Sequence, residues 1–285
     1  MDNIALTTPH NTMHGPIGVF DSGYGGLTVF REIARTLPQY DYIYLGDNAR
    51  APYGIRSFEV IYRYTLECVE KLFEMGCPLV ILACNTASAK ALRSIQQRDL
   101  VTRYSPQHRV LGVIRPTAEV IGTYSQTRSV GILATPGTVI SNSYPIEIEH
   151  FYPDITVCQQ PCPLWVPLIE NGELDGPGAD YFVQKYLNQL LAQSENMDTI
   201  VLGCTHYPLM LPKIRQYTPE HVRLIEQGSI VANSLADYLQ RHPWMDEQCS
   251  KNGSRTFFTS ENDTAAADKV SLFYGQSVAV NHINL

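Results

Sequence analysis

The sequence predicts an α/β protein of two similar α/β domains, each with a mainly parallel central sheet. Short apolar runs alternate with longer amphipathic runs, as in successive strand–helix–strand units. Two segments that each end in a cysteine resemble one another, and their cysteines, Cys84 and Cys204, lie 120 positions apart. The chain has 285 residues, 44% of them hydrophobic and 17% charged, so it can bury a large core and disorder is not expected.

The first alternation begins near the N-terminus. We expect strands over residues 17–20, 42–45 and 79–82, and helices over residues 27–37, 57–75 and 86–97. The helix over residues 57–75 carries an apolar face, and Gly76 follows it as a stop signal. Ligands of parallel sheets bind beyond the carboxyl ends of the strands, and Cys84 lies at such an end.

A second alternation begins at Val110, with strands expected over residues 130–133 and 199–202 and a loop over residues 171–178. The chain from Thr256 onward contains apolar runs suited to a last strand that returns to the first domain. We therefore expect an N-terminal extension over residues 1–14, a first domain of residues 15–111 plus 226–285, and a second domain of residues 112–225.

Two pairs of segments repeat within the chain. "LVILACNT" (residues 79–86) resembles "TIVLGCTH" (residues 199–206), and "IGVFDSGYGG" (residues 17–26) resembles "VGILATPGT" (residues 130–138). Each half then offers one cysteine at the end of a strand. Two such halves, related by a pseudo-twofold axis, can face each other across a cleft that holds the active site.

Two facing cysteines suit the inversion of a carbon centre. One group must remove a proton from one face while the other supplies a proton to the opposite face. A thiol has an ordinary pKa of about 8.5, so both thiol and thiolate are accessible near neutral pH. Free cysteines are also common core residues, and we expect that role for Cys68 and Cys77, and a surface position for Cys249.

Composition argues against several other classes. The net charge of −7 and the lack of a Lys/Arg cluster argue against nucleic-acid binding, and the apolar runs are too short to span a membrane. Seven cysteines, an odd number, without a signal-peptide pattern suit the reducing cytoplasm. The scattered histidines, and Cys158 and Cys162 separated across Pro161, do not favour a metal site.

At these residues the sequence resembles the glutamate racemase family of the aspartate/glutamate racemase superfamily. The similar segments are "GVFDSGYGGLTV", "YLGDNARAPYG", "ACNTAS", "ATPGTV", "CPLWVPLIENGE", "LGCTHYP" and "FFTSEND", in the order of that family. The resemblance implies cofactor-independent interconversion of L- and D-glutamate, a supply of D-glutamate for peptidoglycan, and a homodimer.

The resemblance also implies roles for particular residues. Cys84 would act on D-glutamate and Cys204 on L-glutamate, with Asp21, His206 and Glu170 as further catalytic groups. Residues expected to bind the substrate are Asp21, Ser22, Tyr53, Gly54, Asn85, Thr86, Thr135, Thr138, Thr205 and His206. The sequence departs from the family at "GVIRPT", where Arg115 replaces a residue that is often acidic.

Each role has a simpler alternative. Asp21 suits a turn or a helix cap, His206 a structural position and Glu170 a solvated surface. Asp47 and Arg50 are expected to form a structural ion pair. Alternative functions are racemisation of aspartate or another amino acid, and amino-acid binding without catalysis.

Overall fold

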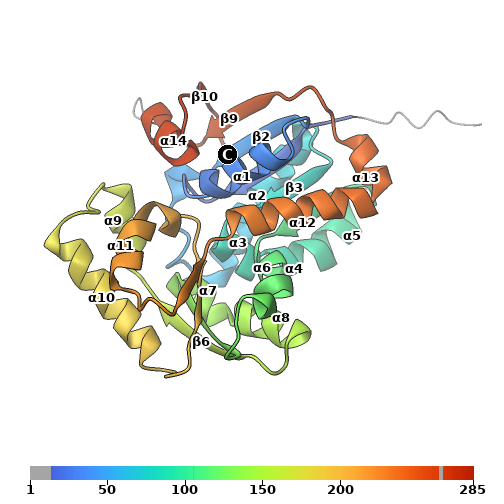
Figure 1. Ribbon diagram of the computed structural model, residues 1–285. Helices are drawn as coiled ribbons and strands as arrows, with labels where there is room; N and C mark the ends of the chain where they lie inside the picture. The colour runs from blue at the N-terminus through green and yellow to red at the C-terminus, as the bar shows by residue number, and fades with distance from the viewer. Residues whose placement is uncertain (1–13, 105, 263–265) are drawn as a thin grey trace, which may run out of the picture.

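The computed structural model describes residues 14–104, 106–262 and 266–285. Two parallel sheets, each covered by helices, make up this part of the chain (Figure 1). The strands are β1 (Ile17–Asp21), β2 (Tyr42–Gly46), β3 (Leu79–Leu82), β4 (Arg109–Gly112), β5 (Ser129–Ala134), β6 (Thr156–Pro161), β7 (Thr199–Gly203), β8 (Arg223–Ile225), β9 (Arg255–Thr259) and β10 (Val280–His282). The predicted α/β class with parallel sheets is confirmed.

The helices connect the strands and cover the sheets. They are α1 (Leu27–Thr36), α2 (Phe58–Glu74), α3 (Asn85–Lys90), α4 (Leu92–Ser94), α5 (Leu100–Arg103), α6 (Ile114–Val120), α7 (Pro136–Ser141), α8 (Ser143–Phe151), α9 (Trp165–Glu170), α10 (Pro177–Leu191), α11 (Leu211–Tyr217), α12 (Gly228–Arg241), α13 (Pro243–Gln248) and α14 (Ala266–Tyr274). Short 3₁₀ turns cover Asn48–Arg50, Ile121–Thr123 and Tyr207–Met210, and a π-helical turn covers Ile95–Asp99.

The first sheet has the strand order β10-β9-β2-β1-β3-β4. The predicted return of the C-terminus is confirmed, because β9 pairs with β2 in parallel and β10 pairs with β9. The strand at Val110 starts a new alternation in the sequence, yet β4 pairs with β3 and closes the edge of this first sheet. Figure 1 shows the blue N-terminal and red C-terminal segments together in the upper part of the view.

The second sheet, β6-β5-β7-β8, repeats the order of β2-β1-β3-β4 in the first. Even the register is equivalent. Gly18 lies opposite Val80, four residues before Cys84, and Gly131 lies opposite Ile200, four residues before Cys204. The internal similarity read from the sequence therefore corresponds to two units with one strand order.

The two repeated glycines have the same physical role. A Cβ at Gly18 would contact Leu72 of α2, and a Cβ at Gly131 would contact Leu190 of α10, so each glycine leaves room for a helix that leads into the neighbouring strand, β3 or β7. We call the part built on the first sheet lobe one (residues 17–112 and 228–282) and the part built on the second sheet lobe two (residues 129–225). The chain passes between them through α6 and again at residues 226–227.

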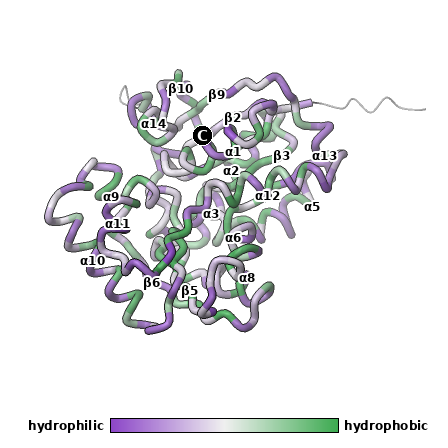
Figure 2. The backbone as a smooth tube through the Cα atoms, viewed as in Figure 1, coloured by the Kyte–Doolittle hydropathy of each residue, from purple (hydrophilic) through white to green (hydrophobic). Residues whose placement is uncertain are grey.

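Hydrophobic burial follows the sequence pattern. β1, β3, β5 and β7 are buried along their whole length, as strands covered on both faces by helices must be. α2 begins after Ser57, whose side chain accepts a hydrogen bond from the Val60 amide, and it ends before Gly76, whose φ is +87°. Figure 2 shows hydrophilic and hydrophobic residues alternating along amphipathic surface helices such as α12.

Two expectations need correction. The single helix predicted over residues 86–97 is broken at Ala91 and passes through α4 into the π-helical turn, because Ser88 hydrogen-bonds the Leu82 carbonyl and the Val113 amide and so packs this segment against strand ends. Cys249 is buried rather than at the surface, because its backbone bridges Gly15 beside the first sheet.

Other expectations concern the ends of the chain and the membrane. Apart from His14, the expected N-terminal extension lies outside the described residues. Within residues 14–104, 106–262 and 266–285, no helix combines the length and the apolar character needed to cross a bilayer.

Candidate active site

A cavity of about 100 Å³ lies at the carboxyl ends of both sheets and is lined by both lobes. Most of the residues selected from the sequence line this cavity, although they come from distant parts of the chain. They are Ser22, Tyr53, Gly54, Cys84, Asn85, Thr86, Thr135, Glu170, Cys204, Thr205 and His206. Several of these residues follow directly after β1, β3, β5 or β7. They lie together because parallel sheets bind ligands beyond the carboxyl ends of their strands.

Cys84 stands at the N-cap of α3 and is only 5% exposed. Its Sγ lies 3.4 Å from the Ser22 hydroxyl and accepts a hydrogen bond from the Ala87 amide, also at 3.4 Å. Burial raises the pKa of the Cys84 thiol to about 12, and the nearby Asp21 carboxylate adds to this increase. Cys84 is therefore a thiol at neutral pH, and its thiolate, once formed, is a strong base.

Asp21 closes β1 and lies behind the cavity wall rather than in it. Its Oδ2 accepts hydrogen bonds from the amides of Gly23 and Gly26 at 3.2 and 2.9 Å, so the turn role expected as an alternative is present. Oδ1 has no hydrogen-bond partner among the described residues. Burial raises the pKa of Asp21, while the nearby His206 ring and the two amides oppose that increase. A buried carboxyl group beside Cys84 is thus available to influence its charge.

Cys204, His206 and Glu170 form a chain of contacts on the opposite side. The Cys204 Sγ lies 3.9 Å from His206 Nδ1, and His206 Nε2 lies 3.0 Å from Glu170 Oε1. Burial works against a charged ring, but the hydrogen bonds to Cys204 and Glu170 outweigh it and raise the pKa of His206 to about 10. Cys204 therefore faces an imidazole whose pKa is raised, whereas Cys84 faces a buried carboxyl group, so the two cysteines have different electrostatic surroundings.

The loop after β1 contacts this second group closely. A Cβ at Gly25 would overlap the His206 ring and lie 2.5 Å from the Thr205 hydroxyl. Across the same boundary, Thr28 Oγ1 donates to the Thr205 carbonyl at 2.9 Å. The glycine-rich loop therefore allows the two lobes to approach closely. Gly25, which has no side chain, lies where the His206 ring needs space.

Hydroxyl groups join the lobes on the Cys84 side. The Thr86 hydroxyl lies 2.9 Å from that of Thr135 and 3.4 Å from that of Thr138, and the last two are 3.1 Å apart. The Gly137 amide also donates to the Gly54 carbonyl at 2.8 Å. Thr138 is fully buried and lies behind Thr135 rather than in the cavity wall.

Tyr53 lines the cavity, but its hydroxyl group is already engaged. It donates to Asp47 Oδ2 at 2.5 Å, and Arg50 Nε donates to the same oxygen at 2.7 Å. The structural ion pair predicted for Asp47 and Arg50 is confirmed. The ring and backbone of Tyr53, rather than its hydroxyl, face a ligand in this arrangement.

Several residues around the cavity were missed from the sequence. Pro163, Val166 and Pro167 line it next to Glu170, in a segment from which only Glu170 was selected. Tyr144 and Gln227 hydrogen-bond Asn85 from behind. No local motif marks them, because only the folded chain brings α8 and the start of α12 to α3.

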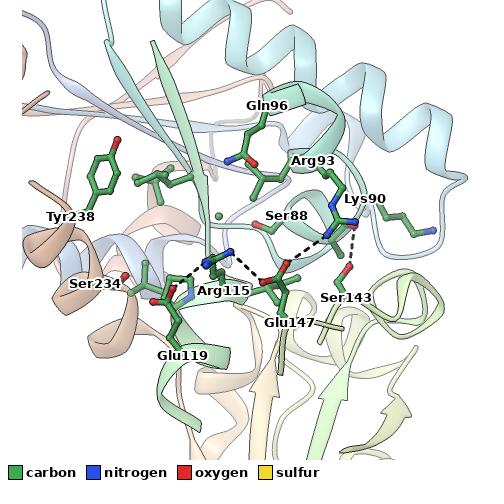
Figure 3. Close-up of a pocket in the computed structure, with 18 of the residues that line it drawn as sticks. Ser88, Lys90, Arg93, Gln96, Arg115, Glu119, Ser143, Glu147, Ser234 and Tyr238 are labelled. Carbon is green, nitrogen blue, oxygen red and sulfur yellow. Dashed lines mark hydrogen bonds and ion pairs between the residues drawn. The ribbon is translucent and has the colours of Figure 1, made fainter. Parts of the chain in front are cut away.

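Figure 3 shows a larger cavity, of about 610 Å³, where α4, α6 and α8 meet. Arg115, the residue that departs from the family pattern, pairs there with Glu119 at 3.0 Å and with Glu147 at 3.8 Å. Arg93 of lobe one reaches the same Glu147 at 3.9 Å. Ion pairs therefore connect the lobes at this second cavity. In the described part of the chain, no three side chains of the types that bind metals are grouped as a metal site requires.

Comparison with known proteins gives consistent results. The family model described as Asp/Glu/hydantoin racemase matches residues 17–235. Among curated proteins, the glutamate racemase of Persephonella marina is 38% identical over 269 residues, covering 94% of this chain and 97% of its own length. That of Geobacter metallireducens is 40% identical over 245 residues, covering 86% of this chain and 87% of its own.

Solved structures agree with the sequence comparison. A crystal structure of a glutamate racemase isoform from Bacillus anthracis superposes with a TM-score of 0.86 at 32% identity, covering 96% of this chain and 98% of its own. That of Francisella tularensis glutamate racemase, in complex with D-glutamate, gives a TM-score of 0.82 at 29% identity, covering 95% and 97%.

Proposed function

The chain belongs to the Asp/Glu/hydantoin racemase family and is an amino-acid racemase, and on that premise we propose that it interconverts L- and D-glutamate by a two-base mechanism. One observation supports this most directly. Cys84 and Cys204 occupy equivalent strand ends in the two lobes and line one cavity. The relatives at 38–40% identity, whose names specify glutamate, support the choice of substrate.

In the proposed reaction, a thiolate takes the α-proton of bound glutamate and leaves its electron pair on Cα and the carboxylate. The other thiol then donates its own proton to the opposite face of Cα. The α-proton is far less acidic than a thiol, so the site must stabilise the developing charge without a pyridoxal group. Donors around the cavity include backbone amides, the Asn85 side-chain amide and the hydroxyls of Ser22, Thr86, Thr135 and Thr205.

The unequal surroundings of the thiols support a direction for each. Cys204 lies 3.9 Å from Nδ1 of His206, and we assign to it the proton of L-glutamate, as the resemblance to glutamate racemases implies. Cys84, whose pKa is about 12, holds the thiol that donates to the other face. In the reverse direction Cys84 acts on D-glutamate. Asp21 influences the charge of Cys84, and Glu170 acts through His206 on Cys204.

Two substitutions test the mechanism. We expect Cys84→Ala and Cys204→Ala each to abolish racemisation, measured by circular dichroism of L- and D-glutamate without added cofactor. In D₂O, the wild-type enzyme should exchange the α-proton of both isomers for deuterium. Cys158→Ala is the matched control, because Cys158 is a free cysteine that does not line the cavity. Full activity in either active-site variant would contradict the two-base assignment.

Three broader expectations accompany this function. D-Glutamate would be supplied for peptidoglycan synthesis in the cytoplasm. L-Aspartate assayed beside L-glutamate separates this enzyme from an aspartate racemase, and tight glutamate binding without α-proton exchange would identify a binding protein instead. The homodimer remains a prediction that sedimentation velocity can check.

A further inference from the structure

Behind the cavity wall, three buried side chains form a closed hydrogen-bonded ring. Asn85 Nδ2 donates to Gln227 Oε1 at 2.8 Å, Gln227 Nε2 donates to the Tyr144 hydroxyl at 2.8 Å, and that hydroxyl donates to Asn85 Oδ1 at 2.6 Å. None of the three is more than 3% exposed. Asn85 alone among them lines the active-site cavity, directly after Cys84.

A backbone carbonyl sets the direction of every hydrogen bond in this ring. Gln227 Nε2 also lies within hydrogen-bond distance of the Val113 carbonyl, at 3.2 Å, and of the Thr117 hydroxyl, at 2.9 Å, so its two hydrogens are shared among three acceptors. A carbonyl oxygen only accepts, so the NH₂ group of Gln227 must face Val113 and its Oε1 must face Asn85. Asn85 then has to present Nδ2 to Gln227, and Tyr144 must donate to Asn85 Oδ1.

The ring therefore decides which end of the Asn85 amide is left for a ligand. Its Oδ1 accepts the Tyr144 hydroxyl, and one hydrogen of Nδ2 is given to Gln227. The second hydrogen of Nδ2 has no acceptor among the described residues, and Asn85 is a residue of the cavity wall. An N–H donor in a nearly closed cavity suits a carboxylate, which only accepts hydrogen bonds.

The same ring contacts both lobes and both of the connections between them. Asn85 starts α3 in lobe one, Tyr144 lies in α8 of lobe two, and Val113 and Thr117 belong to the first connection between them. Gln227 lies in the second connection, at the N-cap of α12. The Asn85–Tyr144 bond spans the two lobes, so a change in the angle between them would disturb the amide of Asn85.

We propose that Gln227 is a positioning residue that, with Tyr144, orients the Asn85 amide so that its free N–H binds a carboxylate of the substrate. This inference rests on the proposed function. Gln227 itself does not contact the substrate. Through the ring, the angle between the lobes would affect how tightly the substrate binds. The expected consequence is a specific loss of affinity rather than a general loss of stability.

The main test is Gln227→Met, which keeps the volume and removes both hydrogen-bonding groups. We expect KM for both glutamate isomers to rise about tenfold or more, the size of effect of one hydrogen bond to a charged group, with a smaller change in kcat. Tyr144→Phe should move KM in the same direction while retaining the packing. Each is measured by circular dichroism, with Tm recorded for every variant.

Two matched controls separate positioning from damage to the fold. Gln96→Met removes a glutamine that donates to the Val110 carbonyl, and Tyr42→Phe removes a buried hydroxyl that donates to the Leu37 carbonyl. Neither residue lines the active-site cavity. Both variants should lower Tm and leave KM within about twofold of the wild type.

A double mutant shows whether Gln227 acts through Asn85. If it does, adding Gln227→Met to Asn85→Ala changes KM by less than about twofold, because the amide that it orients is already absent. An unchanged KM in Gln227→Met and Tyr144→Phe, or an equal further rise in the Asn85→Ala background, would overturn the proposal. If the wild type itself racemises no glutamate, the proposed function fails instead, and D-glutamate affinity by calorimetry then tests the ring in the same variants.

Discussion

At the scale of single residues, the candidate site is asymmetric although its two cysteines arise from a repeat. Cys84 faces a hydroxyl and a buried carboxyl group, whereas Cys204 faces an imidazole backed by Glu170. The repeat supplies two equal positions, and the residues around them give each thiol different charged and polar neighbours. This difference is what a two-base reaction requires, since one base must start deprotonated and the other protonated.

The charge on His206 predicts a dependence of stability on pH. Its pKa is raised from 6.5 to about 10, so the charged ring stabilises the fold fully below about pH 6.5, and that contribution is lost as the pH rises to about 10. We expect the Tm of the wild type to fall more steeply than that of His206→Gln between these two pH values.

Differential scanning calorimetry over the pH range measures this difference. The exposed residue His221 provides the control, and His221→Gln should show the wild-type slope. Parallel Tm curves for the wild type and His206→Gln would show that His206 carries no charge in the folded protein.

At the scale of elements, the two crossover units have the same order but not the same packing. Gly18 and Gly131 each admit a helix to the sheet, yet the space around them differs. An alanine at 131 would place its Cβ 2.6 Å from Met197 Sδ and 2.8 Å from Leu190 Cδ2. An alanine at 18 would find its nearest atoms at 3.2 Å. The second unit is thus the more tightly packed at this point.

This difference predicts unequal effects of the same substitution. Gly131→Ala should lower the free energy of unfolding by about 1–3 kcal/mol, as overpacking of a core does, and Gly18→Ala should lower it by less. Both variants share the gain that alanine brings by restricting the unfolded chain, so their difference reports packing. Urea unfolding measures it, and a greater loss for Gly18→Ala would contradict the prediction.

At the scale of the whole molecule, the site exists only while the lobes meet. The Thr86–Thr135 contact, the Gly137–Gly54 hydrogen bond and the Asn85–Tyr144 hydrogen bond all cross the boundary. Cys84 and Cys204 are 5% and 6% exposed in this arrangement, so a reagent or a substrate needs the lobes to separate before it can enter. We therefore expect opening and closing of the lobes to be part of the catalytic cycle.

Alkylation of the thiols reports that opening. Iodoacetamide should modify the partly exposed Cys158 first, and Cys84 and Cys204 more slowly. D-Glutamate at 100 times its Kd should slow the modification of Cys84 and Cys204 by about 100-fold, if it binds the closed form alone. Peptide mass spectrometry resolves each site, and Cys158 serves as the internal control. Equal rates with and without bound ligand would show that closure does not protect the thiols.

The sequence alone determined the α/β class, the repeat and the two cysteines, because strand hydrophobicity and the residues that end strands are local properties. It placed the helix stop at Gly76 correctly for the same reason. It did not resolve the break after α3 or the burial of Cys249, since these depend on contacts from Val113, directly after β4, and from Gly15, just before β1.

Only the tertiary structure decided how the site is held together. It placed Asp21 and Thr138 behind the wall, committed the Tyr53 hydroxyl to Asp47, and brought Gln227 to Asn85 across 142 positions of the chain. Such contacts carry no local signature, because the hydrogen-bonding needs of a buried side chain can be met by any residue that the fold delivers. The local sequence determines which groups can react, and long-range packing determines how those groups are oriented.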